Sequence, residues 1–377
     1  MSSIWIKAFQ SSDLSDIPTP GGTNYPWQGM FACQVGVMGH ESWKELKWGF
    51  NAGALFDEAL ERQRLFLESQ HSYDIELGLE HTAIRAIAFR FISTTNGLRI
   101  TLMGKVSAKS KEQVTISACD YCNELISTFP YDYQLFPASS RDEFLEMTGY
   151  DLLMSGNENL DIVQIRRCEV PILANRNLPL LQGLWQASGR AHEQIWRSLS
   201  TTQNNIIVNI ILRPTVLYIN DIAMYSKLAA EISNHESIDY EEKIFSSYKE
   251  WYENFTIRRL TPWKKFYYLQ YHIVTKGAVN ESFIRTVGTT LTQNLPVQSP
   301  KPQTLHGYQA IRAPMNKRKE WAEKIYSMNL ISWNSQLPDR RLSEIADLEE
   351  VYSVIRIPYS PPGSEKLGFK YLPVKIE

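Results

Sequence analysis

The sequence has few cysteines and no long apolar run, and each absence excludes a class of protein. Four cysteines among 377 residues are too few and too scattered for a disulfide framework, so we expect reduced thiols and a cytoplasmic protein. No window approaches the ~18 uninterrupted apolar residues that a membrane-spanning helix needs. The first residues show no secretory signal pattern. We therefore predict that the chain does not contact a membrane.

The chain also lacks a strong net charge, since its formal charge at pH 7 is −2. Such a balance provides no whole-molecule field for attracting nucleic acid, so any such binding would depend on a local patch. Aromatic residues make up 12% of the chain, which suits a folded protein with partner-binding surfaces. Because single cores stop growing near ~250–300 residues, we predict two domains, at 1–175 and 176–377, with one domain that carries a large insertion as the alternative.

The pattern of apolar residues indicates an α/β fold, of the α+β kind, with mixed sheets built from strand–helix–strand units. The most specific local signal is a hairpin in which Asn96-Gly97 joins residues 84–93 to the next strand. Ser110 is expected to cap a helix that lies on the sheet. The apolar residues of that helix are Val114, Ile116, Ala118, Tyr121, Cys122 and Leu125.

The second half of the chain repeats these patterns loosely and contains an inserted pair of long helices at about 216–260. Alternation and β-branched residues predict further strands. These lie at 73–79, 162–170, 205–213, 266–275, 307–312 and 352–357. Helical periodicity predicts the remaining helices. These lie at 52–69, 191–200, 281–293 and 315–328.

Motifs for nucleotide or metal chemistry are missing, so we predict no cofactor and no metal. Gly104-Lys105 resembles part of a phosphate-binding loop, but Arg99 stands where the first glycine belongs and Val106 where Ser or Thr belongs. Cys119 and Cys122 form one CxxC pair, whereas a structural zinc site needs four ligands. Core packing of these two cysteines is the simpler interpretation.

One polar segment could hold an unfamiliar catalytic site. Arg190, His192, Glu193 and Arg197 lie close together in the sequence, and a general acid or base could be built from them. Ion pairing at helical spacing explains the same residues. The second histidine of a metalloprotease helix is missing.

A second segment combines basic and aromatic residues that could contact nucleic acid. Its candidate residues are Arg258, Arg259, Trp263, Lys264 and Lys265. Positive charges could neutralise phosphates and rings could stack on bases. A solvated face beside a core strand is the alternative interpretation. A second basic run follows at residues 317–319.

Two stretches resemble the amino-terminal, non-motor region of HerA-like and conjugative-transfer pumping ATPases. The first is the hairpin, helix and FPYDYQLFP segment at 89–137, and the second is EEVYSVIRIPYSPPGSEKLGF at 349–369. Arg356, Pro358, Pro362 and Gly363 carry the second match. The family's motor motifs have no counterpart in this sequence, so the resemblance transfers no catalytic residue. It implies an assembly or substrate-engaging module, which either works beside a separate motor subunit or is the remnant of a longer chain.

Three hypotheses follow from these patterns. The first is a non-catalytic assembly or substrate-engaging module of a larger, ATPase-driven complex, with a protein partner or self-association into an oligomer. The second is an enzyme with its site around Arg190, His192 and Glu193. The third is a nucleic-acid-binding protein that uses the patch at 258–268.

Overall fold

The chain combines helices with one large sheet, which confirms the predicted helix-and-strand fold class. The computed structural model describes residues 4–10, 25–37, 52–71, 84–94, 97–154, 159–171, 180–187, 191–201, 206–234, 258–261, 264–293, 306–331 and 340–358. The predicted strand at 73–79 lies outside these residues. Of the predicted helical pair, helix α8 (Ile219–Asn234) is described, and residues 235–257 are not.

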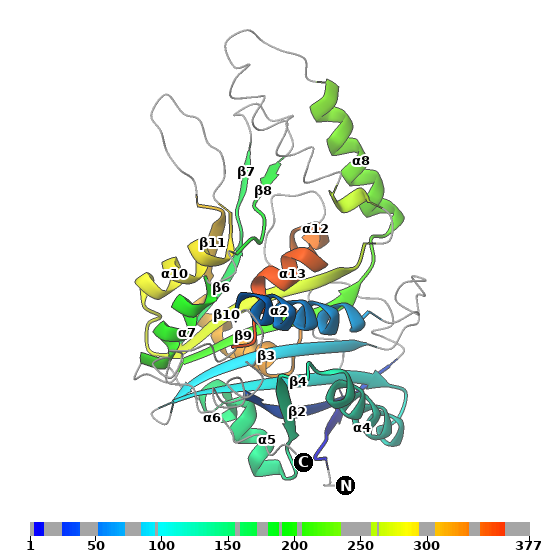
Figure 1. Ribbon diagram of the computed structural model, residues 1–377, viewed down its shortest axis with the longest axis vertical. Helices are drawn as coiled ribbons and strands as arrows, with labels where there is room; N and C mark the ends of the chain where they lie inside the picture. The colour runs from blue at the N-terminus through cyan, green and yellow to red at the C-terminus, as the bar shows by residue number, and fades with distance from the viewer. Residues whose placement is uncertain are drawn as a thin grey trace.

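Within the described residues, ten strands form one sheet in the order β1-β2-β4-β3-β9-β10-β6-β11 (Figure 1). Two short strands complete it, since β5 pairs with β2 and β12 pairs with β10. Their bounds are β1 Lys7–Gln10, β2 Trp27–Val37, β3 Arg85–Thr94, β4 Gly97–Ala108, β5 Tyr133–Pro137, β6 Leu160–Arg167, β9 Ile206–Thr215, β10 Phe266–Lys276, β11 Tyr308–Arg312 and β12 Ile345–Asp347. A separate small sheet pairs β7 (Glu169–Pro171) with β8 (Leu180–Gln182).

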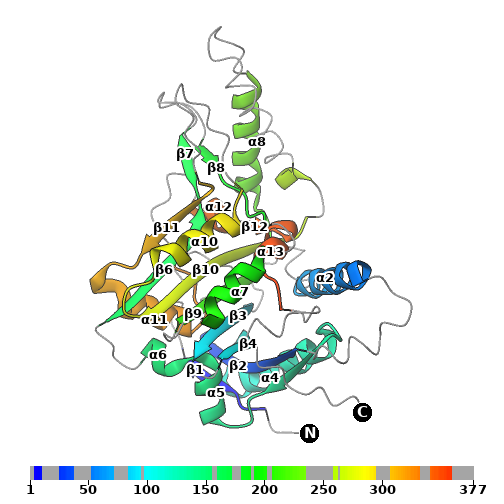
Figure 2. The same cartoon turned by 60° about the vertical axis from the view of Figure 1, so that its left-hand side comes forward.

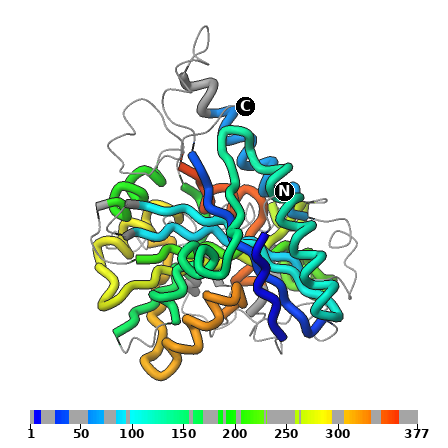
Figure 3. The backbone as a smooth tube through the Cα atoms, turned by 90° about the horizontal axis from the view of Figure 1, so that it is seen from below, coloured from blue at the N-terminus to red at the C-terminus, as the bar shows by residue number. Residues whose placement is uncertain are grey.

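Each strand pair that the structure describes is antiparallel. Strands from both sides of residue 175 share the large sheet, and β6 lies between β10 and β11. The predicted boundary at that residue therefore does not separate two sheets. The blue strands β1 and β2 lie side by side at one end of the sheet (Figure 3).

Helices cover both faces of the sheet (Figure 2). One core cluster includes buried residues from α2 (Ala52–Ser69), α4 (Lys111–Thr128), α7 (His192–Thr201), α10 (Glu281–Leu291) and α13 (Leu348–Val354). The cluster on the opposite face includes residues from α5 (Arg141–Thr148), α6 (Tyr150–Met154), α11 (Arg318–Tyr326) and α12 (Arg340–Glu344). Helix α8 extends away from the sheet (Figures 1 and 2).

The predicted hairpin is confirmed, since β3 and β4 pair in a register that joins Thr94 to Gly97. Gly104 lies on β4, inside this hairpin. A Cβ atom at position 104 would lie 2.0 Å from the Phe31 ring, so only glycine lets that ring pack on the strand. The Gly-Lys pair therefore serves the core of the sheet.

Helix α4 begins where the sequence predicted, because the Ser110 side chain accepts a hydrogen bond from the Gln113 backbone N–H. The predicted apolar face is buried except at one position. Ile116 is 62% exposed, so its assignment to the packed face is wrong. Cys122 packs against Cys33 with 3.6 Å between their sulfur atoms, and both thiols are free. Core packing of Cys122 is thereby confirmed.

The predicted strand at 352–357 is wrong, because helix α13 occupies residues 352–354 and residues 355–357 belong to no strand. Asp347 and Glu350 form a capping box, in which each side chain accepts from the other residue's backbone N–H. This pair fixes a helix start. The β-branched residues that suggested a strand instead form the buried side of the helix and the extended segment after it.

Two buried cations hold α11 against the sheet. The Arg90 guanidinium on β3 donates to Thr148 O at 2.6 Å and also to Ile325 O, so it binds the carboxyl ends of α5 and α11. Lys105 on β4 donates to Ser327 O at 3.0 Å, just beyond the end of α11. Cations are favoured at helix carboxyl ends, where carbonyl groups lack intrahelical donors.

Candidate functional site

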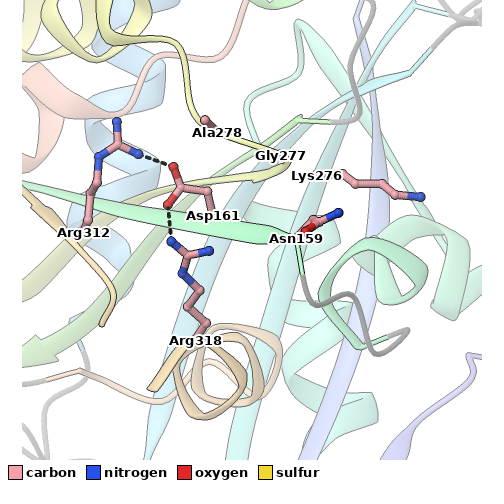
Figure 4. Close-up of a pocket in the computed structure, with 7 residues that line it drawn as sticks. All are labelled: Asn159, Asp161, Lys276, Gly277, Ala278, Arg312 and Arg318. Atoms are coloured by element: carbon pink, nitrogen blue, oxygen red, sulfur yellow. Dashed lines mark hydrogen bonds and ion pairs between the residues drawn. The ribbon is translucent and has the colours of Figure 1, made fainter. Parts of the chain in front are cut away.

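The strongest candidate site is a cleft of about 420 Å³ at the rim of the sheet, which we call the Asp161 cleft. Its lining residues are Asn159, Asp161, Lys276, Gly277, Ala278, Arg312 and Arg318 (Figure 4). Strands β10, β6 and β11 are neighbours and antiparallel, so the start of β6 lies beside the ends of β10 and β11. This topology gathers side chains from four separate segments of the chain.

Asp161 is the buried centre of the cleft. It is the second residue of β6, and its Oδ2 atom accepts from the Val279 backbone N–H at 2.9 Å. The same oxygen pairs with Arg312, the last residue of β11. Its Oδ1 atom lies 3.5 Å from Arg318, the first residue of α11. A buried carboxylate needs such partners, and Asp161 thereby ties α11 to the sheet.

Lys276 and Asn159 lie on the other side of Asp161 from Arg312 (Figure 4). Lys276 ends β10 and is exposed. The chain then turns at Gly277, whose φ of 89° favours glycine, and the Gly277 N–H donates to Asn159 O at 2.7 Å. This turn closes the wall of the cleft between Lys276 and Ala278.

The electrostatics of the cleft favour an anion. Three lining residues are cations and one is a carboxylate, so positive charge is in excess. Arg312 also pairs with Glu281 outside the lining. Burial alone would lower the pKa of Arg312, but Glu281 and Asp161 outweigh burial and raise that pKa. The guanidinium therefore stays charged at neutral pH.

The chemistry that this arrangement supports is binding. Arginine forks and a lysine ammonium supply several donors to an anionic group. The residues that line the cleft include no Ser, Cys, His or Tyr side chain that could act as a nucleophile or transfer a proton near neutral pH. Among the described residues, no group of three His, Cys, Asp or Glu side chains could hold a metal ion.

The residues of the predicted catalytic segment are not gathered around a substrate-sized space. Arg190 lies outside the described residues, and Arg197 is exposed on α7 while His192 is buried. His192 donates from Nε2 to Val354 O at 3.1 Å. Burial, and then the nearby charge of Arg356, lowers the pKa of His192 to about 3, so its ring is neutral at pH 7. Glu193 is partly buried on the same helix.

A small cavity does lie beside His192, between α7 and the sheet. His192, Trp196, Tyr271 and Arg356 are among its lining residues, and its volume is about 10 Å³. A single water molecule needs roughly that much space. The cavity therefore has no room for a substrate, and the catalytic assignment of this segment stays a prediction.

The predicted basic–aromatic patch contains arginines that are already paired with carboxylates. Arg258 donates twice to Asp347, at 2.5 and 2.6 Å. Arg259 is buried and donates to Glu350 at 2.6 Å. Trp263 lies outside the described residues. The two arginines thus bind the amino-terminal end of α13, and Arg259 is covered by protein.

The two lysines of the patch also lie near carboxylates. Lys264 is 3.6 Å from Asp347, and Lys265 is 3.6 Å from Glu68 on α2. Both ammonium groups keep partial exposure. Tyr267, two residues after Lys265, is fully buried. The net positive field of the patch is therefore smaller than the sequence suggested. Nucleic-acid binding by this patch stays a prediction.

The Asp347 ion pairs predict a pH-dependent stability. Burial alone would raise the pKa of Asp347, but its bonds to Arg258 and the charge of Arg259 outweigh burial and lower it to about 2. A carboxylate with a lowered folded-state pKa stabilises the fold above its unfolded pKa near 4, and this contribution is lost as pH falls toward 2. We expect Asp347→Asn to cost about 2 kcal/mol at pH 6.

Urea denaturation of both proteins at several pH values checks this expectation. The difference in free energy of unfolding between wild type and Asp347→Asn should shrink as pH falls from 4 to 2. Glu349→Gln, at an exposed position two residues further along, is the control and should show a small difference at every pH. A constant difference for Asp347→Asn would show that its charge does not matter.

Sequence reasoning missed most residues of the Asp161 cleft. Asp161, Lys276 and Arg312 stand at strand ends that lie far apart in the sequence. Arg318 belongs to the second basic run, at residues 317–319, to which the sequence assigned no site. A polar residue at the end of each neighbouring strand is the only signal, and it becomes informative once the strand order is known.

Comparisons with known proteins give this chain no family. No protein-family model matches it, and no curated protein matches it either. In the part of the chain that the structure describes, no helix is both long enough and apolar enough to cross a membrane.

Proposed function

We propose that this chain is a non-catalytic, substrate-engaging module of a larger assembly, and that it holds an anionic partner or substrate in the Asp161 cleft. The observation that carries the proposal is the cleft itself. It is open, has a volume of about 420 Å³, and is lined by three cations and a single carboxylate. Substrate-binding sites commonly have volumes of ~300–1,000 Å³ with a few convergent polar groups.

The other parts of the proposal rest on the sequence and on the cysteines. Resemblance to the non-motor region of pumping ATPases favours a motor ATPase as the protein partner. Four free thiols fit a reducing compartment, so we place the module in the cytoplasm. Light scattering on the purified chain, with and without such an ATPase, tests the assembly. A monomer whose mass never changes would contradict it.

Charge reversal in the cleft gives a direct test of anion binding. Lys276 is exposed, has no ion pair among those that the structure shows, and lines the cleft, so Lys276→Glu removes cleft charge without breaking a described contact. We expect Lys276→Glu to weaken the binding of a fluorescent polyanion by roughly tenfold, since a close charge pair becomes a repulsion. Fluorescence anisotropy with oligothymidylate and with poly-L-glutamate measures this binding.

The matched control is Lys111→Glu, which makes the same change of net charge at the exposed first residue of α4. It should leave polyanion binding nearly unchanged, and wild-type binding should weaken as salt is added. If both variants lose the same affinity, binding depends on overall charge and the cleft has no special role. If the wild type binds neither polyanion, the proposed function is wrong.

A further inference from the structure

A row of polar side chains crosses the middle of the large sheet, and we infer that ordered water molecules bind along it. The row runs over five adjacent strands, and its members are directly paired in the strand register: Thr101 on β4, Arg90 on β3, Asn209 on β9, His272 on β10 and Gln164 on β6. All five side chains are fully buried. Directly paired residues lie on the same face of a sheet, so these side chains form a continuous line.

The row lies on the sheet face that α11 covers, among apolar side chains. Residues two positions away along the same strands point to the same face, and these include Ile162, Ile211 and Val274. They belong to one core cluster with Trp321 and Ile325 of α11. A polar group in such surroundings needs a hydrogen-bond partner, because burying it without one is unfavourable.

Most of the row has no partner within the part of the chain that the structure describes. Arg90 is satisfied, since it donates to Asn209 Oδ1 at 2.7 Å and to carbonyl groups at two helix ends. The Asn209 Nδ2 atom, both ring nitrogens of His272 and both amide atoms of Gln164 have no hydrogen-bond partner there. The same holds for Thr101 Oγ1. Folded proteins rarely leave neighbouring buried polar atoms unpaired, so the row indicates a bound ligand.

The Asn209 amide directs its unpaired donor toward His272. Arginine only donates, so the atom that faces Arg90 on β3 must be the oxygen. The Nδ2 atom then lies on the β10 side, where His272 is the directly paired residue. Neighbouring strands are about 4.8 Å apart, and a water molecule can bridge two polar side chains across such a spacing. The same spacing separates His272 from Gln164 on β6.

The ligand of the row must both donate and accept hydrogen bonds. Burial, and then the charges of Arg166 and Arg90, lowers the pKa of His272 to about 3, so at pH 7 its neutral ring has one donor and one acceptor nitrogen. The amide of Gln164 also offers both. An anion only accepts, and the two arginines repel a cation. Water fulfils both roles and commonly bridges buried polar groups. About two molecules fit the row, one on each side of His272.

Counting long-lived water molecules in solution tests the inference. Oxygen-17 magnetic relaxation dispersion on the full chain detects water that stays bound inside the protein. His272→Phe keeps a ring but removes both bridging nitrogens, so we expect it to lose about two such molecules relative to the wild type. Gln164→Met should lose about one. His306→Phe makes the first change at an exposed histidine and should lose none. An unchanged count in His272→Phe and Gln164→Met would overturn the inference.

A crystal structure of the wild type gives a test that no substitution can disturb. We expect ordered water within hydrogen-bond distance of Asn209, His272 and Gln164. Direct hydrogen bonds among these side chains, or an ion between them, would overturn the inference. Stability adds a further measurement. Because His272→Phe leaves the bridged groups without partners, its unfolding equilibrium constant at a fixed urea concentration should rise roughly tenfold. A fall in that constant would show that the row is dry.

Discussion

An Arg90→Leu variant is expected to lose about 3 kcal/mol or more of its free energy of unfolding, which is a large part of the stability of an ordinary domain. Arg90 is fully buried, and its guanidinium binds four acceptors on three elements. Those acceptors are Asn209 Oδ1, Thr148 O, Ile325 O and Tyr326 O. Leucine would remove this donor from all four, although Ile325 O would still accept from the Met328 backbone N–H.

In Arg90→Leu, the free energy lost with the hydrogen bonds should exceed the free energy gained by removing a buried charge. Burial lowers the pKa of Arg90 to about 9, so keeping the guanidinium charged in the core has a cost that leucine avoids. Each buried acceptor without a donor costs about 1–3 kcal/mol, and several are created at once. Arg90→Lys should fall between wild type and Arg90→Leu, because one ammonium cannot reach two helix ends and Asn209 together.

Arg99→Leu is the matched control for Arg90→Leu. Arg99 lies on the paired strand β4 and contacts the same helix, through the Glu146 carboxylate and carbonyl, but both side chains are partly exposed. An exposed pair of this kind contributes less than about 1 kcal/mol. Urea denaturation measures both variants. Similar losses for Arg90→Leu and Arg99→Leu would show that the buried position confers no special role.

The fold was predictable where the signals were local. The hairpin of β3 and β4, the capped helix α4 and the strands β9 and β10 all follow from turn residues, a cap or a continuous apolar run. Helix α13 was missed because β-branched residues near Val354 suggested a strand. The Asp347–Glu350 capping box decided the conformation there, and its buried partners lie far away in sequence.

The charged residues show why sequence reasoning fails for sites. The sequence alone suggests that Arg258 is a free cation. In the structure, its Nε atom lies 2.5 Å from a carboxylate oxygen of Asp347, a residue of β12 that is 89 positions further along the chain. The burial of Arg90 within its strand follows from two helix ends, at Thr148 and Ile325, that lie far from it in the sequence. The Asp161 cleft depends in the same way on β6 lying between β10 and β11. Contacts of this kind depend on the order of the strands in the sheet. The periodicity of apolar residues predicts where strands lie in the sequence, but it does not predict their order.

The carboxylate of Glu350 is the second place where a single substitution should have a large effect. It is fully buried and accepts from Arg167 at 2.7 Å and from Arg259 at 2.6 Å. The backbone N–H groups of Trp185 and Asp347 complete its partners, at 3.3 and 3.2 Å. Glu350 therefore joins β6, the segment before α7 and the residues before β10 to helix α13.

We expect Glu350→Ala to reduce the free energy of unfolding by about 3–5 kcal/mol, because two buried guanidinium groups lose their counter-charge. The adjacent Glu349 pairs with Arg64 at the surface, and Glu349→Ala should cost less than about 1 kcal/mol. This control changes the same residue type on the same helix. Chemical denaturation measures the free energy of unfolding of both variants. The difference between them should show how much of the effect depends on the burial of the carboxylate and how much on its loss alone.

A double-mutant cycle tests whether stranded charge causes the loss. If it does, Arg259→Met should be less harmful in the Glu350→Ala background than in the wild type, because it removes a cation that has already lost its partner. Arg259 also lies 5.9 Å from the Tyr225 ring, so some loss of packing should persist in both backgrounds. If the losses in free energy of unfolding for Glu350→Ala and Arg259→Met are additive, the effect of Glu350→Ala comes instead from the capping box and from the packing of α13.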